Sequence, residues 1–157
     1  MAASSRKFLL VVGQSGDGKS TLINNLLHPS EKARAETGLC NEGVTKKISM
    51  YRAKPCMNSE FVFLVDTPGV GDQTVPVTEL ISQLEDEFQL NTIDGVLVTS
   101  RADDSRTGLG ANIVKMIVDK GIVGGSDKWD NVILVGTRSD KCDDDSGEKE
   151  YFMSETR

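Results

Sequence analysis

The sequence predicts a three-layer α/β fold in which helices cover both faces of a mostly parallel β-sheet. Apolar runs alternate with helical patterns along the chain, which is typical of such a sheet. A glycine-rich segment at residues 13–20 joins the first apolar run directly to the first helical pattern. A chain of 157 residues is long enough for one domain that buries about two-thirds of its unfolded surface. We therefore expect a single domain over residues 1–157.

Each element of this fold has its own signal in the sequence. The strands are expected near residues 7–12, 47–53, 60–65, 93–100 and 131–136, and the helices near 18–28, 77–90 and 109–121. The runs at 61–65 and 132–135 are continuously apolar, as in strands that are buried on both faces. Apolar residues that recur at helical spacing should face the core: Leu80, Ile81, Leu84, Phe88, Ile113 and Ile117.

The segment at residues 13–20 matches the phosphate-loop pattern G-x-x-x-x-G-K-[ST]. Its glycines permit a tight curl, so that successive N–H groups converge on an anion at a helix N-terminus. In this pattern Lys19 reaches the β- and γ-phosphates and serves catalysis, while the Ser20 hydroxyl coordinates Mg²⁺. The expected nucleotide contacts are Gly13, Gln14, Ser15, Gly16, Asp17, Gly18, Lys19, Ser20 and Thr21. The alternative is a glycine-rich turn that matches by chance.

Asp66-Thr67-Pro68-Gly69 follows the third expected strand, where ligands bind in open α/β sheets. Asp66 is a candidate Mg²⁺ ligand, acting through a water molecule. The amide of Gly69 is expected to reach a γ-phosphate oxygen and so to take part in catalysis. The alternative is an ordinary Pro-Gly turn.

Thr137-Arg138-Ser139-Asp140 follows the fifth expected strand. This is the place of the guanine-reading N/T-K-x-D motif in small GTP-binding domains. The Asp140 carboxylate would accept hydrogen bonds from N1–H and the amino group of guanine, a donor pair that adenine lacks. Arg138 would lie on the base in place of lysine, and Thr137 replaces asparagine. The alternative is a polar turn after a strand.

The long polar stretch at residues 29–46 is expected to be a functional loop. Thr45 is the candidate threonine that completes Mg²⁺ coordination in the GTP state and serves catalysis. Thr37 is the competing candidate, but Thr45 directly precedes the second expected strand. A surface threonine at the start of a strand is the alternative interpretation.

Composition limits the remaining function classes. The net charge is −6 and the isoelectric point is about 4.8, which argues against a nucleic-acid binder. No apolar stretch approaches the length of a membrane span. The three cysteines, Cys40, Cys56 and Cys142, lack metal-ligand spacing, so we expect a reduced, cytoplasmic setting.

Taken together, these motifs resemble the immunity-associated GTPases (the IAN or GIMAP group), relatives of the septins and of the chloroplast import-receptor GTPases. The matching segments are residues 13–20, 44–46, 66–70, 106–107 and 137–140, within a resemblance that runs from residue 7 to 141. The resemblance implies a P-loop NTPase fold of the small GTPase-like type (a G domain), GTP and GDP as ligands, Mg²⁺ as cofactor, and dimerisation of GTP-bound domains across the nucleotide face.

Two departures from the family pattern have consequences. Val70 follows Gly69 where Ras-like enzymes carry a glutamine that orients the attacking water. We therefore expect slow hydrolysis by the monomer, with a group supplied in trans by a second copy. Gln14 and Arg106 are candidate helpers, and the alternative favoured for each is an ordinary polar loop residue. The usual last strand and helix are also not visible in residues 141–157, so the domain is expected to be C-terminally shortened.

A shortened domain would expose one edge of the sheet. Without a sixth strand, residues 132–135 would lie on an apolar edge that invites pairing with another chain. A partner, or a short strand at residues 148–153, could cover it.

The leading functional hypothesis is a GTP-binding protein with slow, Mg²⁺-dependent GTP hydrolysis. It would act as a nucleotide-controlled switch in which residues 29–46 and 67–76 order around the γ-phosphate. A GTP- or GDP-dependent scaffold that scarcely hydrolyses is the alternative. A P-loop kinase or ATPase is disfavoured by Asp140 and by the lack of an arginine-rich lid segment.

Overall fold

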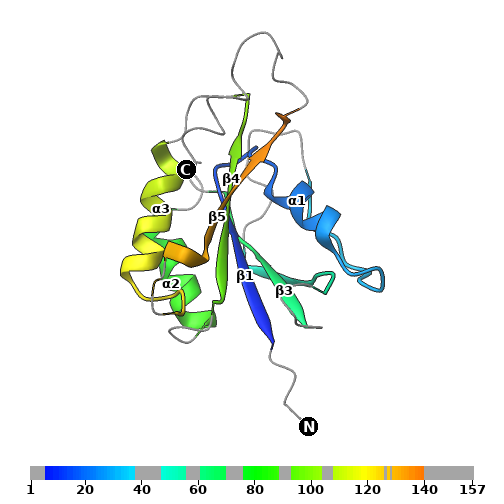
Figure 1. The fold of residues 1–157 in the computed structure, drawn as a ribbon, viewed down its shortest axis with the longest axis horizontal. Helices are drawn as coiled ribbons and strands as arrows, with labels where there is room; N and C mark the ends of the chain where they lie inside the picture. Colours follow the sequence, from blue (N-terminus) through cyan, green and yellow to red (C-terminus); the bar gives the residue numbers. More distant parts are fainter. Residues whose placement is uncertain are drawn as a thin grey trace.

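The computed structural model describes residues 6–37, 47–55, 61–69, 76–88, 93–103, 108–125, 127 and 129–139. Five strands form one sheet in the order β2-β3-β1-β4-β5, as Figure 1 shows. The strands are β1 (Lys7–Val12), β2 (Ser49–Arg52), β3 (Val62–Asp66), β4 (Gly95–Arg101) and β5 (Val132–Thr137). All neighbours pair in parallel except β2, which runs antiparallel to β3. The predicted, mostly parallel sheet is therefore confirmed.

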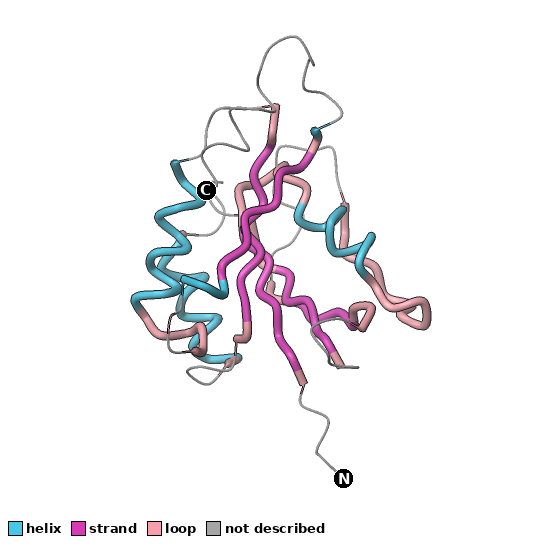
Figure 2. The backbone as a smooth tube through the Cα atoms, viewed as in Figure 1, coloured by secondary structure: helices cyan, strands magenta, loops and turns pink. Residues whose placement is uncertain are grey.

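Helices lie on both faces of this sheet (Figures 1 and 2). Helix α1 (Lys19–Leu26) covers one face, while α2 (Val77–Glu87) and α3 (Gly108–Asp119) cover the other. A 3₁₀ turn, Trp129–Asn131, leads into β5. The three expected helices form within a few residues of their predicted bounds, in the part of the chain that the structure describes.

The core has two halves because side chains of the central strand alternate between the faces. Leu10 and Val12 of β1 pack with α2 and α3, whereas Leu9 and Val11 pack with Ile23 of α1. The helix positions expected to face the core are all buried: Leu80, Ile81, Leu84, Phe88, Ile113 and Ile117. Because β1, β3, β4 and β5 run parallel, their carboxyl ends lie on the same side of the molecule, where the glycine-rich loop follows β1.

Strand β5 forms an edge of the sheet. The side chains of Ile133 and Leu134 are 56% and 42% exposed. The expectation that this run is buried on both faces is therefore wrong, because β5 pairs only with β4 among the described residues. The expected apolar edge is present. The possible covering strand at residues 148–153 lies outside the described residues.

No helix within the described ranges is both long and apolar enough to cross a lipid bilayer.

Candidate phosphate and nucleotide site

The loop between β1 and α1 has the curled backbone that its glycines predict. Gly16 and Gly18 have φ angles of 82° and 81°, in the left-handed region where glycine carries no Cβ penalty. Gly18 forms the N-cap of α1, so the first turn of that helix opens toward the loop. Lys19 is buried, and its Nζ donates to the carbonyls of Gly13 at 3.1 Å and Gln14 at 2.8 Å. The lysine is thereby held across the loop.

Three threonine hydroxyls tie neighbouring strand ends either to the end of β1, which leads into this loop, or to the loop itself. Thr67, after β3, donates to the Val11 carbonyl at 2.8 Å, and Thr99 of β4 donates to the Val12 carbonyl at 3.1 Å. Thr137, at the end of β5, donates to the Asp17 carbonyl at 2.9 Å and to that of Ser100 at 3.3 Å. The carboxyl ends of three strands therefore position one loop. Sequence reasoning missed Thr67 and Thr99, although each is a hydroxyl residue at the end of an apolar run.

Two glycines allow backbones to approach the loop closely. A Cβ at Gly13 would lie 2.2 Å from Thr99 Oγ1. A Cβ at Gly69 would lie 2.9 Å from Ser15 Cα and 3.0 Å from Ser15 N. The turn after β3 thus lies directly against the phosphate loop, as the predicted roles of Gly13 and Gly69 require.

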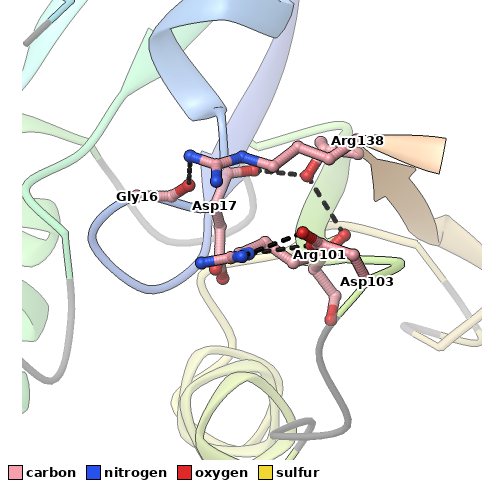
Figure 3. Close-up of polar contacts among 7 residues, drawn as sticks. Gly16, Asp17, Arg101, Asp103 and Arg138 are labelled. Carbon is pink, nitrogen blue, oxygen red and sulfur yellow. Dashed lines mark hydrogen bonds and ion pairs between the residues drawn. The ribbon is translucent and has the colours of Figure 1, made fainter. Parts of the chain in front are cut away.

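Arg138 reaches from β5 over the loop, as Figure 3 shows. Its Nη2 donates to the Gly16 carbonyl at 3.2 Å, and its backbone takes a φ of 56°. Such a left-handed conformation is uncommon for a residue with a Cβ and occurs often at functional sites. The structure therefore joins the predicted base-reading segment to the phosphate loop through Thr137 and Arg138.

An ion pair follows β4 on the same side of the site (Figure 3). Arg101 Nε and Nη2 each donate to a carboxylate oxygen of Asp103 at 2.9 Å. This fork geometry and the nearby charge of Arg138 lower the pKa of the Asp103 carboxyl below its ordinary value. Neither Arg101 nor Asp103 was predicted as a site residue, because their pairing carries no motif.

Two of the three predicted Mg²⁺ ligands, Asp66 and Ser20, lie within the described residues. Asp66 is 1% exposed at the end of β3, and Ser20 is half-buried in the first turn of α1. The pKa of Tyr51 on β2 is raised above its ordinary value, mainly by burial and secondly by the negative charge of Asp66. A hydroxyl and a carboxylate are hard oxygen donors of the kind that Mg²⁺ binds together with phosphates and water. The residues present therefore fit this ion.

Several predicted residues lie outside the described part of the chain. These are Thr45, Val70, Arg106 and Asp140. Thr37, the competitor of Thr45, is exposed in the extended segment after α1. Thr21 is exposed in the first turn of that helix.

Taken together, the mostly parallel sheet and the phosphate loop after β1 define the class of P-loop NTPases. Within that class, the chain matches the AIG1 family over residues 7–157, and it therefore belongs to the AIG1 family. The resemblance to the immunity-associated GTPases is confirmed.

Comparison with individual proteins agrees with this class. A neuronal-specific septin-3 of Danio rerio is 31% identical over 90 residues, covering 51% of this chain and 25% of the septin. Toc33 from Arabidopsis thaliana, solved with Mg²⁺ and GMPPNP, superimposes with a TM-score of 0.64 at 22% identity, covering 96% of this chain and 57% of Toc33.

A further structure concerns the chloroplast translocon components atToc33 and psToc159, for whose GTPase activity dimerization is important. It matches with a TM-score of 0.60 at 18% identity, over 96% of this chain and 60% of that one. This chain thus spans a quarter of the septin and somewhat over half of the translocon chains.

Proposed function

We propose that this protein binds GTP and GDP with Mg²⁺, hydrolyses GTP slowly to GDP, and acts as a nucleotide-controlled switch. The observation that carries the proposal is that Lys19 and Thr137 bond within the phosphate loop, while Thr67 and Thr99 bond the end of β1 that leads into it. That arrangement presents backbone N–H groups and one ammonium group at the carboxyl ends of β1, β3, β4 and β5. AIG1 family membership supports the choice of a GTPase over a kinase.

The chain's own groups suffice to bind the phosphates. The N–H groups of residues 13–21 converge on the anion at the N-terminus of α1, and Lys19 neutralises charge on the β- and γ-phosphates. The amide of Gly69, held against Ser15, would donate to a γ-phosphate oxygen. Because most of phosphoryl transfer is positioning and charge stabilisation, a rigid loop of this kind is the main catalytic requirement.

Mg²⁺ would be held by Ser20, by Asp66 through water, and by Thr45 in the GTP state. When bound, the ion neutralises phosphate charge. The buried position of Asp66 keeps that carboxylate in place at the end of β3.

Guanine selection would come from the segment after β5. Arg138 lies over the loop at Gly16, where its guanidinium plane could support a base. Asp140, two residues further on, would accept from the two guanine donors. Adenine would leave that carboxylate without its partners, which disfavours ATP.

We expect hydrolysis to depend on a second copy of the chain, because Val70 cannot hydrogen-bond the attacking water. Dimerization is important for the GTPase activity of the translocon relatives, which supports this expectation. The test is the single-turnover rate of GTP hydrolysis as the protein concentration rises. A rate constant that increases with concentration supports a dimer-dependent GTPase, and a concentration-independent constant contradicts it.

Val70 also favours a second candidate function, a nucleotide-dependent scaffold. If the protein binds GTP and dimerises but turns over no GTP at any concentration, the scaffold replaces the GTPase.

A further inference from the structure

We propose that the Ser15 hydroxyl is a catalytic group that orients the water attacking the γ-phosphate. This inference rests on the proposed function and names a residue for its hydrolytic step. Ser15 was predicted only as part of the phosphate-binding backbone, so a side-chain role is a new assignment.

The contact between Ser15 and Gly69 places the serine at the γ-phosphate end of the loop. The three atoms nearest to a Cβ built on Gly69 all belong to Ser15: Cα at 2.9 Å, N at 3.0 Å and Cβ at 3.1 Å. The Gly69 amide is the expected donor to a γ-phosphate oxygen. The Ser15 side chain therefore begins beside the position that this phosphate would take.

The Ser15 hydroxyl is also available for a ligand. Ser15 is half-buried, and within the described residues its side chain makes no hydrogen bond. The neighbouring hydroxyl of Thr67 is by contrast already engaged with the Val11 carbonyl. Val70, the residue after Gly69, has no polar group in its side chain. Ser15 thus offers a polar side chain at the place where Ras-like enzymes use glutamine.

The hydrolytic step requires of Ser15 only that it orient the attacking water. In hydrolysis, the water oxygen forms a bond to the γ-phosphorus while the bond to the bridging oxygen breaks and GDP departs. The water proton passes to a γ-phosphate oxygen, so no external base is needed. A serine hydroxyl has two acceptor lone pairs and one donor. It can accept a hydrogen bond from the water and hold it in line without any net proton transfer to Ser15.

The experiment compares Ser15→Ala and Ser15→Thr with the wild-type chain under saturating Mg²⁺ and GTP. Ser82→Ala, on the exposed face of α2, is the matched control. Single-turnover hydrolysis, GDP affinity by calorimetry and thermal unfolding are measured for each protein, at several protein concentrations. We expect Ser15→Ala to hydrolyse GTP about tenfold more slowly, because the variant loses one hydrogen bond to the attacking water. Ser15→Thr should retain most of the rate, and GDP affinity should be unchanged in all variants.

A Ser15→Ala variant as fast as the wild type overturns the inference. So does a loss of GDP affinity in parallel with the rate, since that result assigns Ser15 to the loop structure alone. If the wild-type chain binds GDP but hydrolyses no GTP, the inference fails while guanine binding stands. If the wild-type chain binds neither nucleotide, the proposed function itself is overturned and this inference with it.

Discussion

At the scale of single residues, Gly69 is the position where two backbones touch. Gly69→Ala would place a Cβ 2.9 Å from Ser15 Cα, an approach that backbone must relieve by moving. Overpacking of this kind costs about 1–3 kcal/mol. We expect a lower melting temperature and a larger loss of affinity for a GTP analogue than for GDP, because we propose that the Gly69 amide donates to the γ-phosphate.

The matched control for this substitution is Gly95→Ala. Its Cβ would meet the Leu9 Cδ2 atom at 3.1 Å, the end of a side chain that can move. Calorimetry and thermal unfolding of both variants test the prediction. If Gly69→Ala loses affinity for the two nucleotides to the same extent, Gly69 does not contact the γ-phosphate.

The Arg101–Asp103 pair predicts a pH dependence of stability. The folded-state pKa of Asp103 lies below its ordinary value of 3.8. The pair therefore stabilises the fold above that value, and its contribution is lost as the pH falls through the lower, folded-state pKa. We expect the difference in melting temperature between wild type and Asp103→Asn to be largest near neutral pH and to shrink in acid.

Thermal unfolding between about pH 7 and about pH 2 measures this difference. Asp119→Asn, at the exposed end of α3, is the control and should follow the wild-type profile. A constant gap between wild type and Asp103→Asn across this range would mean that the ion pair does not stabilise the fold.

How far residues could be predicted depended on how local their signal is. Gly16 and Gly18 lie in one contiguous motif, so their positive φ angles could be inferred before any fold was known. Thr99 and Arg101 could not, because their partners are a strand away or have no fixed spacing. Thr137 was predicted as a base-reading residue, and the structure adds its bond to Asp17.

At the scale of elements, the strand ends form the framework of the site. Thr99 is 1% exposed, and its hydroxyl donates to the Val12 carbonyl. Thr99→Val keeps the shape of the side chain but leaves that buried carbonyl without this donor. We expect a loss of about 1 kcal/mol in the free energy of unfolding, together with weaker GDP binding.

Urea unfolding and GDP calorimetry check this prediction, with Thr78→Val on the exposed surface of α2 as the control. If Thr99→Val binds GDP as tightly as the wild type, the hydroxyl bond does not hold the loop in its binding conformation.

The elements themselves were predicted well because their patterns are strong. Strands β1, β3, β4 and β5 follow apolar runs, and α2 and α3 follow apolar stripes at helical spacing. Burial of β5 was predicted wrongly, since an apolar run does not reveal whether a strand has one neighbour or two. The exposed side chains of Ile133 and Leu134 are the result.

At the scale of the whole molecule, the fold brings the proposed site residues of the described ranges together at the carboxyl ends of the parallel strands. The buried strand β1 leads into the phosphate loop, and its neighbours β3 and β4 carry the threonines that fix it. A fold of this kind presents a polyanion site on an acidic chain, because Lys19 lies in the phosphate loop and Arg138 reaches over it. The proposed selection of guanine over adenine depends on one residue, Asp140.

Titration calorimetry with GDP, GMPPNP and ADP in the presence of Mg²⁺ tests whether this chain is a GTP-binding protein. We predict clear binding of the two guanine nucleotides, weak or no binding of ADP, and loss of the guanine preference in Asp140→Ala. The control Asp119→Ala should bind as the wild type does. Equal binding of ADP and GDP by the wild-type chain would contradict the assignment as a GTP-binding protein.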